Sequence, residues 1–226
     1  MANARRIAVL GLYNSGSTGV ADMLHHLGVC MAPPFWEVSD STAENNFYEP
    51  YELSWHLRKW WDEPRAVEQV PASVRVNYLR QWALLQESLG ASPVIGATHP
   101  LLSLCGEDLL EAWGADTRFL WSWRPLAESI AGLERREWFA ADAGALQRRL
   151  WDALERFDRS HPRLAVKLDW NEVKADPVRG ARALAAFAGI DADEERVRQA
   201  AARIRPQPTG NGIKRQIKAA LRKAMS

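Results

Sequence analysis

The residues best suited to chemistry lie near the start of the chain, where residues 11–18 read Gly-Leu-Tyr-Asn-Ser-Gly-Ser-Thr. A glycine-rich turn between a strand and a helix lets backbone N–H groups converge on a phosphate, and the helix dipole adds to the attraction. The nucleoside-triphosphate form of this motif has lysine where the sequence has Ser17, which weakens a kinase interpretation. The segment therefore predicts a phosphate-binding loop. The alternative is a turn whose small residues only cap the helix.

Strands and helices alternate along the chain that must position this loop. Short apolar runs predict four buried strands, at residues 7–10, 93–97, 118–123 and 164–168. Helical spacing and end signals predict helices at residues 17–27, 71–90, 101–113, 125–139, 145–157, 176–189 and 193–204. Residues 31–65 are expected to be irregular. This alternation predicts an α/β protein with a parallel sheet flanked by helices, and ligands beyond the C-terminal ends of the strands.

Composition limits the class of protein. The chain has 226 residues, 47% of them hydrophobic, and shows no internal repeat or linker, so we expect one domain over residues 1–226. The net charge of +1 gives no sign of nucleic-acid binding. Its two cysteines have no metal-ligand spacing, and no run has transmembrane length or the form of a signal peptide. We therefore expect a cytoplasmic protein.

With this order of elements, the sequence resembles the sulfotransferases that use 3′-phosphoadenosine 5′-phosphosulfate (PAPS), especially their bacterial branch. Four blocks carry the resemblance, and a shorter stretch from Asp176-Pro177 to Gly189-Ile190 resembles the family's D-P…F-x-G-[IL] close. The blocks are residues 11–18, similar to the 5′-phosphosulfate loop; Glu44-Asn45-Asn46-Phe47-Tyr48-Glu49-Pro50, similar to an E-N-x-x-G-F-W-E segment; Ala97-Thr98-His99-Pro100, similar to K-T-H-x-P; and Phe119-Leu120-Trp121-Ser122-Trp123-Arg124-Pro125, similar to the strand and arginine that bind the 3′-phosphate.

The resemblance implies a P-loop NTPase-like sulfotransferase fold, PAPS or its product PAP as cofactor, a small-molecule or glycan acceptor, and no metal. It implies His99 as the general base, because histidine titrates near neutral pH, and Asn14 at the catalytic position of the loop. It implies a cofactor site at Tyr13, Asn14, Ser15, Gly16, Ser17, Thr18, Arg124, Ser129, Gly132, Lys214 and Arg215. It implies an acceptor site at Phe47, Tyr48 and His56, within an excursion or lid at residues 31–70.

Three positions depart from the family pattern. Asn14 stands where the family has a basic residue, Ala97 where it has a lysine, and Gly132 where it has a serine, for which Ser129 is a substitute one turn earlier. Cations are thus missing where charge develops during transfer. The replacement cation could come from Lys167, Arg80 or the basic tail at residues 206–226. Otherwise the donor is not PAPS, or the loop binds a ligand without catalysis.

Three functions therefore stay open. The first is a sulfotransferase acting on a hydroxyl group, and the second is a nucleotide-binding module of the same fold. The third is a kinase-type phosphotransferase, which the missing loop lysine makes the weakest. Two features of the sequence bear on the acceptor side without deciding it. Trp55, Trp60 and Trp61 form either an aromatic wall for an acceptor or the core of a lid. The basic tail is a solvated helix face, a cofactor-wrapping loop, or a segment that binds an anionic membrane surface, although one short basic segment is marginal for that.

Overall fold

The protein is built on a sheet of four parallel strands, as the sequence predicts. The computed structural model describes residues 4–35, 48–62, 66–90, 92–135 and 142–204. The strands lie in the order β4 (Val94–Thr98), β1 (Arg5–Gly11), β5 (Arg118–Trp123) and β6 (Ala165–Asp169). After two arginines, the central strand β1 is an aliphatic run at residues 7–10 that is buried on both faces, which is typical of a parallel strand covered by helices.

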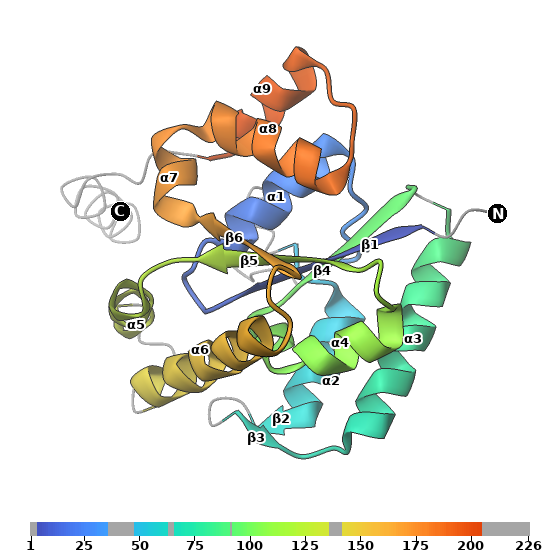
Figure 1. Ribbon diagram of the computed structural model, residues 1–226, viewed down its shortest axis with the longest axis vertical. Helices are drawn as coiled ribbons and strands as arrows, with labels where there is room; N and C mark the ends of the chain where they lie inside the picture. Colours follow the sequence, from blue (N-terminus) through green and yellow to red (C-terminus); the bar gives the residue numbers. More distant parts are fainter. Residues whose placement is uncertain (1–3, 36–47, 63–65, 91, 136–141, 205–226) are drawn as a thin grey trace, which may run out of the picture.

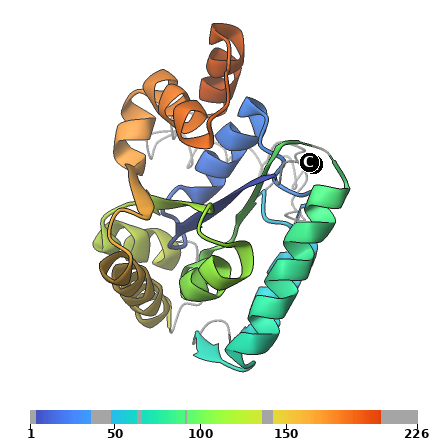
Figure 2. The same ribbon diagram turned by 45° about the vertical axis from the view of Figure 1, so that its right-hand side comes forward.

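Helices cover both faces of this sheet (Figures 1 and 2). On one face, Ile7 and Val9 of β1 pack with α1 (Ser17–Leu27), α8 (Pro177–Ala188) and α9 (Glu194–Ala202). On the other face, Ala8 and Leu10 face a second core. This second layer comprises α2 (Tyr51–Trp60), α3 (Ala72–Ser88), the 3-10 helix η1 (Pro100–Leu104), α4 (Gly106–Trp113), α5 (Leu126–Glu134) and α6 (Ala143–Ser160). The predicted fold class is confirmed.

Two predictions about elements were wrong, and one helix was missed. Residues 31–65 are not irregular throughout, because α2 and the short strand β2 (Trp61–Asp62) fall within them; β2 pairs with β3 (Val67–Glu68). The predicted helix at residues 101–113 is broken at Cys105, where the backbone leaves helical geometry (φ −110°, ψ 20°). A short helix, α7 (Trp170–Ala175), follows β6 without having been predicted.

The tryptophans of α2 and β2 are divided between the core and the surface. Trp60 and Trp61 are buried, as a lid core would require, whereas Trp55 is 46% exposed. The buried residues of α2 recur at helical spacing, at Leu53, Ser54, Leu57 and Trp60. None of the described helices is long and apolar enough to cross a bilayer.

The sheet topology brings the candidate residues to one edge. After β1 and α1, the chain enters the sheet again as β4, on one side of β1. It later forms β5 on the other side of β1, so the connections diverge at the C-terminal end of β1. Such a switch point is where open α/β sheets bind ligands. The loop at residues 11–18, His99, Arg124 and Trp170 all lie at or just beyond the C-terminal ends of these parallel strands.

Candidate functional site

The loop after β1 has two residues in the left-handed region. Asn14 has φ 59° and Gly16 has φ 93°, with Ser15 between them and α1 starting at Ser17. Asparagine and glycine are the residues that tolerate this conformation best. Alternation of left- and right-handed residues is the backbone geometry of an anion-binding concavity. The local sequence thus favours the turn that the chemistry requires.

The carbonyl groups of this loop all accept hydrogen bonds from the protein. Six consecutive oxygens, from Gly11 to Gly16, each have a donor within 3.2 Å. The donors are Ser103 Oγ to Gly11, Ser15 N to Leu12, Gln147 Nε2 to Tyr13, Arg124 Nη1 to Asn14, Ser122 Oγ to Ser15 and Val20 N to Gly16. The oxygens that would repel an anion are therefore held by the protein.

The N–H groups at the start of α1, unlike the loop carbonyl groups, are available to a ligand. The first N–H groups of an α-helix have no partner within the helix. Gly16 is the N-cap residue, and no described side chain caps this end. Ser17 and Thr18 add hydroxyl groups to the same first turn. This end of α1 can therefore donate several hydrogen bonds to a phosphate or sulfate group, assisted by the helix dipole.

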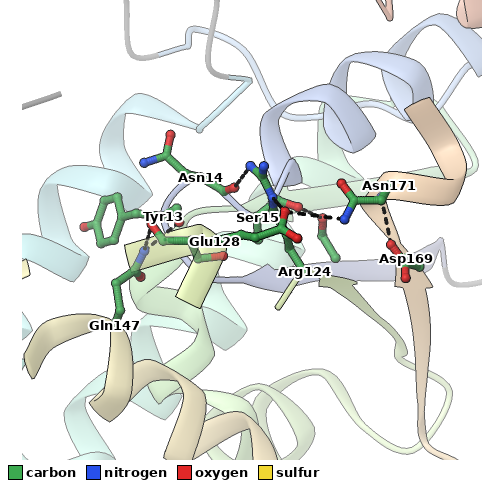
Figure 3. A network of polar contacts seen from close by, with 10 residues as sticks. Tyr13, Asn14, Ser15, Arg124, Glu128, Gln147, Asp169 and Asn171 are labelled. Carbon is green, nitrogen blue, oxygen red and sulfur yellow. Dashed lines mark hydrogen bonds and ion pairs between the residues drawn. The ribbon is translucent and has the colours of Figure 1, made fainter. Parts of the chain in front are cut away.

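Arg124 ties the loop to the end of β5 (Figure 3). Its Nη1 donates to the Asn14 carbonyl oxygen at 3.0 Å, and its Nε lies 2.9 Å from Glu128 Oε2. Asn171 Nδ2 also donates to that carboxylate, at 3.4 Å. The hydrogen bond from Arg124 is the main cause that lowers the pKa of Glu128. Because Glu128 is largely exposed, an incoming anion can compete with it for the guanidinium.

Trp170 covers the glycines at the start of α1. A Cβ atom at Gly16 would lie 2.1 Å from the Trp170 ring, and one at Gly19 would lie 2.3 Å from it. Trp170 follows β6 directly, and Asp169 caps α7 by accepting from Asn171 N at 2.7 Å. The indole therefore fixes both positions as glycine. Trp170 could not be assigned from the sequence, because only the fold brings it to the loop.

Two departures from the family pattern touch each other. A Cβ atom at Gly132 would lie 3.1 Å from the Asn14 Cβ atom, so the Asn14 side chain packs against α5 where a serine would stand. Ser129, the suggested substitute, is fully buried; its Oγ has no partner among the described residues, and neither has Asn14 Nδ2. The positions that lack the basic residue (Asn14) and the serine (Gly132) are therefore in direct contact.

His99 lies at the end of β4 in a buried corner of its own. It is 1% exposed, and its Nδ1 accepts from Leu101 N at 3.0 Å. Burial, together with the positive charge of Arg58, lowers its pKa to about 3. The expectation that His99 titrates near neutral pH was therefore wrong, because desolvation disfavours the imidazolium. With Nδ1 accepting a hydrogen bond, the neutral ring carries its proton on Nε2.

Glu49 and Arg58 join His99 in this corner, although neither was assigned from the sequence. The Glu49 carboxylate oxygen lies 3.6 Å from His99 Nε2, and Glu49 is 9% exposed. Glu49 falls in the block that resembles the family, which was a usable signal. Arg58 offered no signal, because a single arginine on α2 has no distinctive pattern until the fold brings its charge near His99.

The predicted acceptor residues do not lie together. Tyr48 is 6% exposed in the core on the α1 side of the sheet, 5.3 Å from the His25 ring. His56 lies on α2, on the other side, with its ring 4.0 Å from that of Tyr78. Phe47, the third predicted residue, lies outside the described residues. The structure therefore does not group Tyr48 with His56.

The replacement cations proposed from the sequence lie in different environments. Lys167 Nζ lies 2.9 Å from Asp158 and 4.3 Å from the centre of the Trp121 ring, so its charge is engaged on β6. Arg80 is exposed on α3. Lys214, Arg215 and the rest of the tail at residues 206–226 lie outside the described residues. In the described part of the chain, no group of three His, Cys, Asp or Glu residues is placed to hold a metal ion.

Comparison with solved structures places this architecture among known folds. The sulfotransferase STF9 from Mycobacterium avium is 17% identical with a TM-score of 0.61, over 92% of this chain and 70% of that one. The sulfotransferase domain of the olefin synthase from Synechococcus PCC 7002 is 15% identical with a TM-score of 0.55, over 94% and 83% of the two chains. The chain has the sulfotransferase fold. No family model and no curated protein sequence matches it.

Proposed function

We propose that the protein is a sulfotransferase that moves a sulfuryl group from PAPS to a hydroxyl group of a small molecule or glycan. One observation carries the proposal: six consecutive loop carbonyls accept hydrogen bonds from the protein, which leaves the N–H groups at the start of α1 as the donors to a ligand. Those donors suit the 5′-phosphosulfate of PAPS. The sulfotransferase fold supports this choice over a nucleoside triphosphate, as does Ser17 at the kinase lysine position.

The residues of the loop and of β5 fit this cofactor. When bound, PAPS supplies the activated sulfuryl group. The N–H groups of Gly16, Ser17 and Thr18 would hold the sulfated phosphate and would stabilise the negative charge that develops there during transfer. Arg124, which pairs with Glu128 in this structure, would hold the 3′-phosphate, because its planar guanidinium can donate two hydrogen bonds to one phosphate group.

The corner at the end of β4 serves the acceptor. His99 presents Nε2–H toward the Glu49 carboxylate, and that carboxylate is the group we assign to accept a proton from the acceptor hydroxyl. For His99 itself to act as the base, its Nδ1 atom would first have to lose the hydrogen bond that it accepts from Leu101 N. Arg58, whose charge acts on His99, stands in for the cations absent at Asn14 and Ala97.

A PAP-binding module with little catalysis is the second candidate. Asn14 offers a neutral amide where transfer needs a charge, and Lys167 is engaged by Asp158. This candidate shares the loop and Arg124 with the first. The two differ only in whether sulfuryl transfer takes place.

Calorimetric titration of the protein with PAP, ATP and ADP tests both candidates. We expect PAP to bind more tightly than ATP or ADP, and Arg124→Ala to weaken PAP at least tenfold, because a charge-assisted pair is lost. Arg118→Ala is the matched control: Arg118 lies at the opposite end of β5 and donates to the Phe187 carbonyl. Absence of PAP binding by the wild-type protein would overturn both candidates.

PAP release from PAPS, measured over a panel of phenol, alcohol and sugar acceptors, separates the two candidates. Acceptor-dependent PAP release by the wild-type protein supports the sulfotransferase. If only Asn14→Lys releases PAP, the wild-type protein is the binding module, and the missing cation is the reason.

A further inference from the structure

A polar residue occupies an apolar position of α6. The buried face of this helix is Ala143, Leu146, Gln147, Leu150, Leu154 and Phe157, which is the spacing of a helix packed on a core. Gln147 is 0% exposed in the middle of that face. Burying an amide is costly unless its hydrogen bonds are satisfied, so its presence requires a reason.

The amide nitrogen of Gln147 bridges two elements of the donor site. Nε2 donates to the Tyr13 carbonyl oxygen at 2.7 Å and to the Ser129 carbonyl oxygen at 3.1 Å (Figure 3 shows the first contact). Tyr13 belongs to the loop and Ser129 to α5, so one side chain joins the two. Arg124, just before α5, makes the neighbouring connection by donating to the Asn14 carbonyl.

The Tyr13 contact sets the direction of the next N–H group. A peptide unit is planar and trans, so the N–H of Asn14 points opposite to the Tyr13 carbonyl. While Gln147 holds that oxygen, the Asn14 N–H is directed away from α6. If the peptide rotated, a carbonyl oxygen would turn toward the bound anion instead. Gln147 therefore determines whether this peptide directs its N–H group or its carbonyl oxygen toward the anion.

The other half of the amide argues against a purely structural role. Gln147 Oε1 is buried and has no partner among the described residues. A leucine at this position would bury no unsatisfied oxygen on α6, but it would leave the Tyr13 carbonyl without the donor that Gln147 supplies. A residue kept for packing alone would thus be apolar.

We propose that Gln147 is a positioning residue of the donor site, which orients the Tyr13–Asn14 peptide and fixes the loop relative to Ser129 of α5. The proposal rests on the proposed function, because the loop it positions is the one assigned to the 5′-phosphosulfate. The side chain acts through the loop backbone and not on the transferred group.

The experiment compares Gln147→Leu and Gln147→Glu with Leu154→Ala, a control two turns along the same buried face. For each protein we measure the Kd for PAP, the melting temperature and the ¹³C resonance of the Tyr13 carbonyl. Gln147→Leu should weaken PAP about tenfold and shift the carbonyl resonance to lower frequency, because Tyr13 loses a donor. Leu154→Ala should lower the melting temperature without either change.

Gln147→Glu adds a pH profile that packing alone would not produce. Its carboxylate cannot donate to Tyr13, but burial raises the pKa of such a carboxyl group, and its protonated form regains an O–H donor. Relative to the wild type at each pH, PAP binding by Gln147→Glu should be weak at neutral pH and recover as the pH falls. Gln147→Leu should show no recovery.

Two results would overturn the proposal: an unchanged Tyr13 resonance in Gln147→Leu, or weakening of PAP in Leu154→Ala to the same degree. Absence of PAP binding by the wild-type protein would overturn the proposed function instead. In that case the Tyr13 resonance, which needs no ligand, still decides whether Gln147 holds the loop.

Discussion

Two corners at the same edge of the sheet handle their buried polar groups differently. In the donor corner, which comprises residues 11–18, Arg124 and Gln147, each loop carbonyl from Gly11 to Gly16 has a hydrogen-bond donor from the protein. In the acceptor corner, which comprises Glu49, Arg58 and His99, the His99 Nε2 atom is buried without a hydrogen-bond partner among the described residues. Residues 11–18 and Arg124 follow β1 and β5, and His99 follows β4, in the same parallel sheet.

The difference matches the two tasks that the proposed function assigns to these corners. Binding an anion requires dipoles fixed in advance, and hydrogen bonds to the carbonyls provide that rigidity. Moving a proton requires a group whose charge can change, and desolvation adjusts its pKa. The donor corner is therefore prepared for binding, whereas the acceptor corner holds its histidine neutral, with Glu49 as the candidate proton acceptor.

The largest effect is expected for Gly16→Ala in the donor corner. The new Cβ would lie 2.1 Å from the Trp170 ring at a φ of 93°, so the loop and the indole must move apart. PAP binding should fall at least 100-fold by calorimetry, because the N–H groups lose their common orientation. Gly90→Ala is the control: Gly90 also has a positive φ, of 63°, but a Cβ atom there would meet no other atom within 4 Å. Equal PAP binding by both variants would show that loop geometry is not preorganised.

The next effect is a pH dependence of stability in the acceptor corner. Folded His99 stays neutral down to a pKa of about 3, while the unfolded chain takes up a proton below about 6.5. The contribution of His99 to the free energy of unfolding is fully present above pH 6.5. It is lost as the pH falls toward 3, by about 1.4 kcal/mol per pH unit. His99→Asn keeps an acceptor for Leu101 N, so its unfolding free energy, measured with urea, should fall less steeply over this range.

His161→Asn is the control for that series, since His161 is partly exposed and pairs with Glu107. Its stability should follow the wild-type slope at acid pH more closely than that of His99→Asn. Parallel slopes for wild type and His99→Asn would mean that His99 is not desolvated, and the contrast between the corners would disappear.

A smaller effect is expected for Glu128→Gln, which removes the carboxylate that competes for Arg124. PAP should bind a few-fold more tightly at low salt, and the gain should shrink as salt screens the pair. Glu194→Gln is the control, because it breaks a similar exposed pair with Arg182 far from the loop in the sequence. Weaker PAP binding by Glu128→Gln would mean that Glu128 orients Arg124 instead of competing with the ligand.

The contrast between the corners also separates what the sequence could predict from what it could not. The four strands of the parallel sheet and α1 were predicted to within about two residues, because apolar runs and glycines are local signals. The loop was predicted for the same reason. Helix α2 was missed because an exposed Trp55 and neighbouring aromatics obscure its apolar spacing.

The supports of both corners depend on contacts that are distant in sequence. Gln147 is 134 residues from Tyr13, and its spacing on α6 resembles that of an apolar residue. Trp170 and Gly16 are likewise joined only by the fold. The pKa of His99 depends on burial and on Arg58, neither of which its neighbours in the sequence disclose. The sequence therefore predicts the ligand-facing backbone better than the groups that hold it.

The smallest effect is expected at Asn14, and it separates the backbone role of this residue from that of its amide. Asn14 has φ 59°, which Ala adopts at a cost of about 1 kcal/mol and Gly adopts freely. Asn14→Ala should therefore lower the unfolding free energy by about that amount, and Asn14→Gly by less. Both variants lose the side-chain amide, whose Nδ2 is buried against Gly132 without a partner among the described residues. Calorimetry with PAP then decides: equal weakening in both assigns the amide to the ligand, whereas weakening in Asn14→Ala alone assigns Asn14 to the turn.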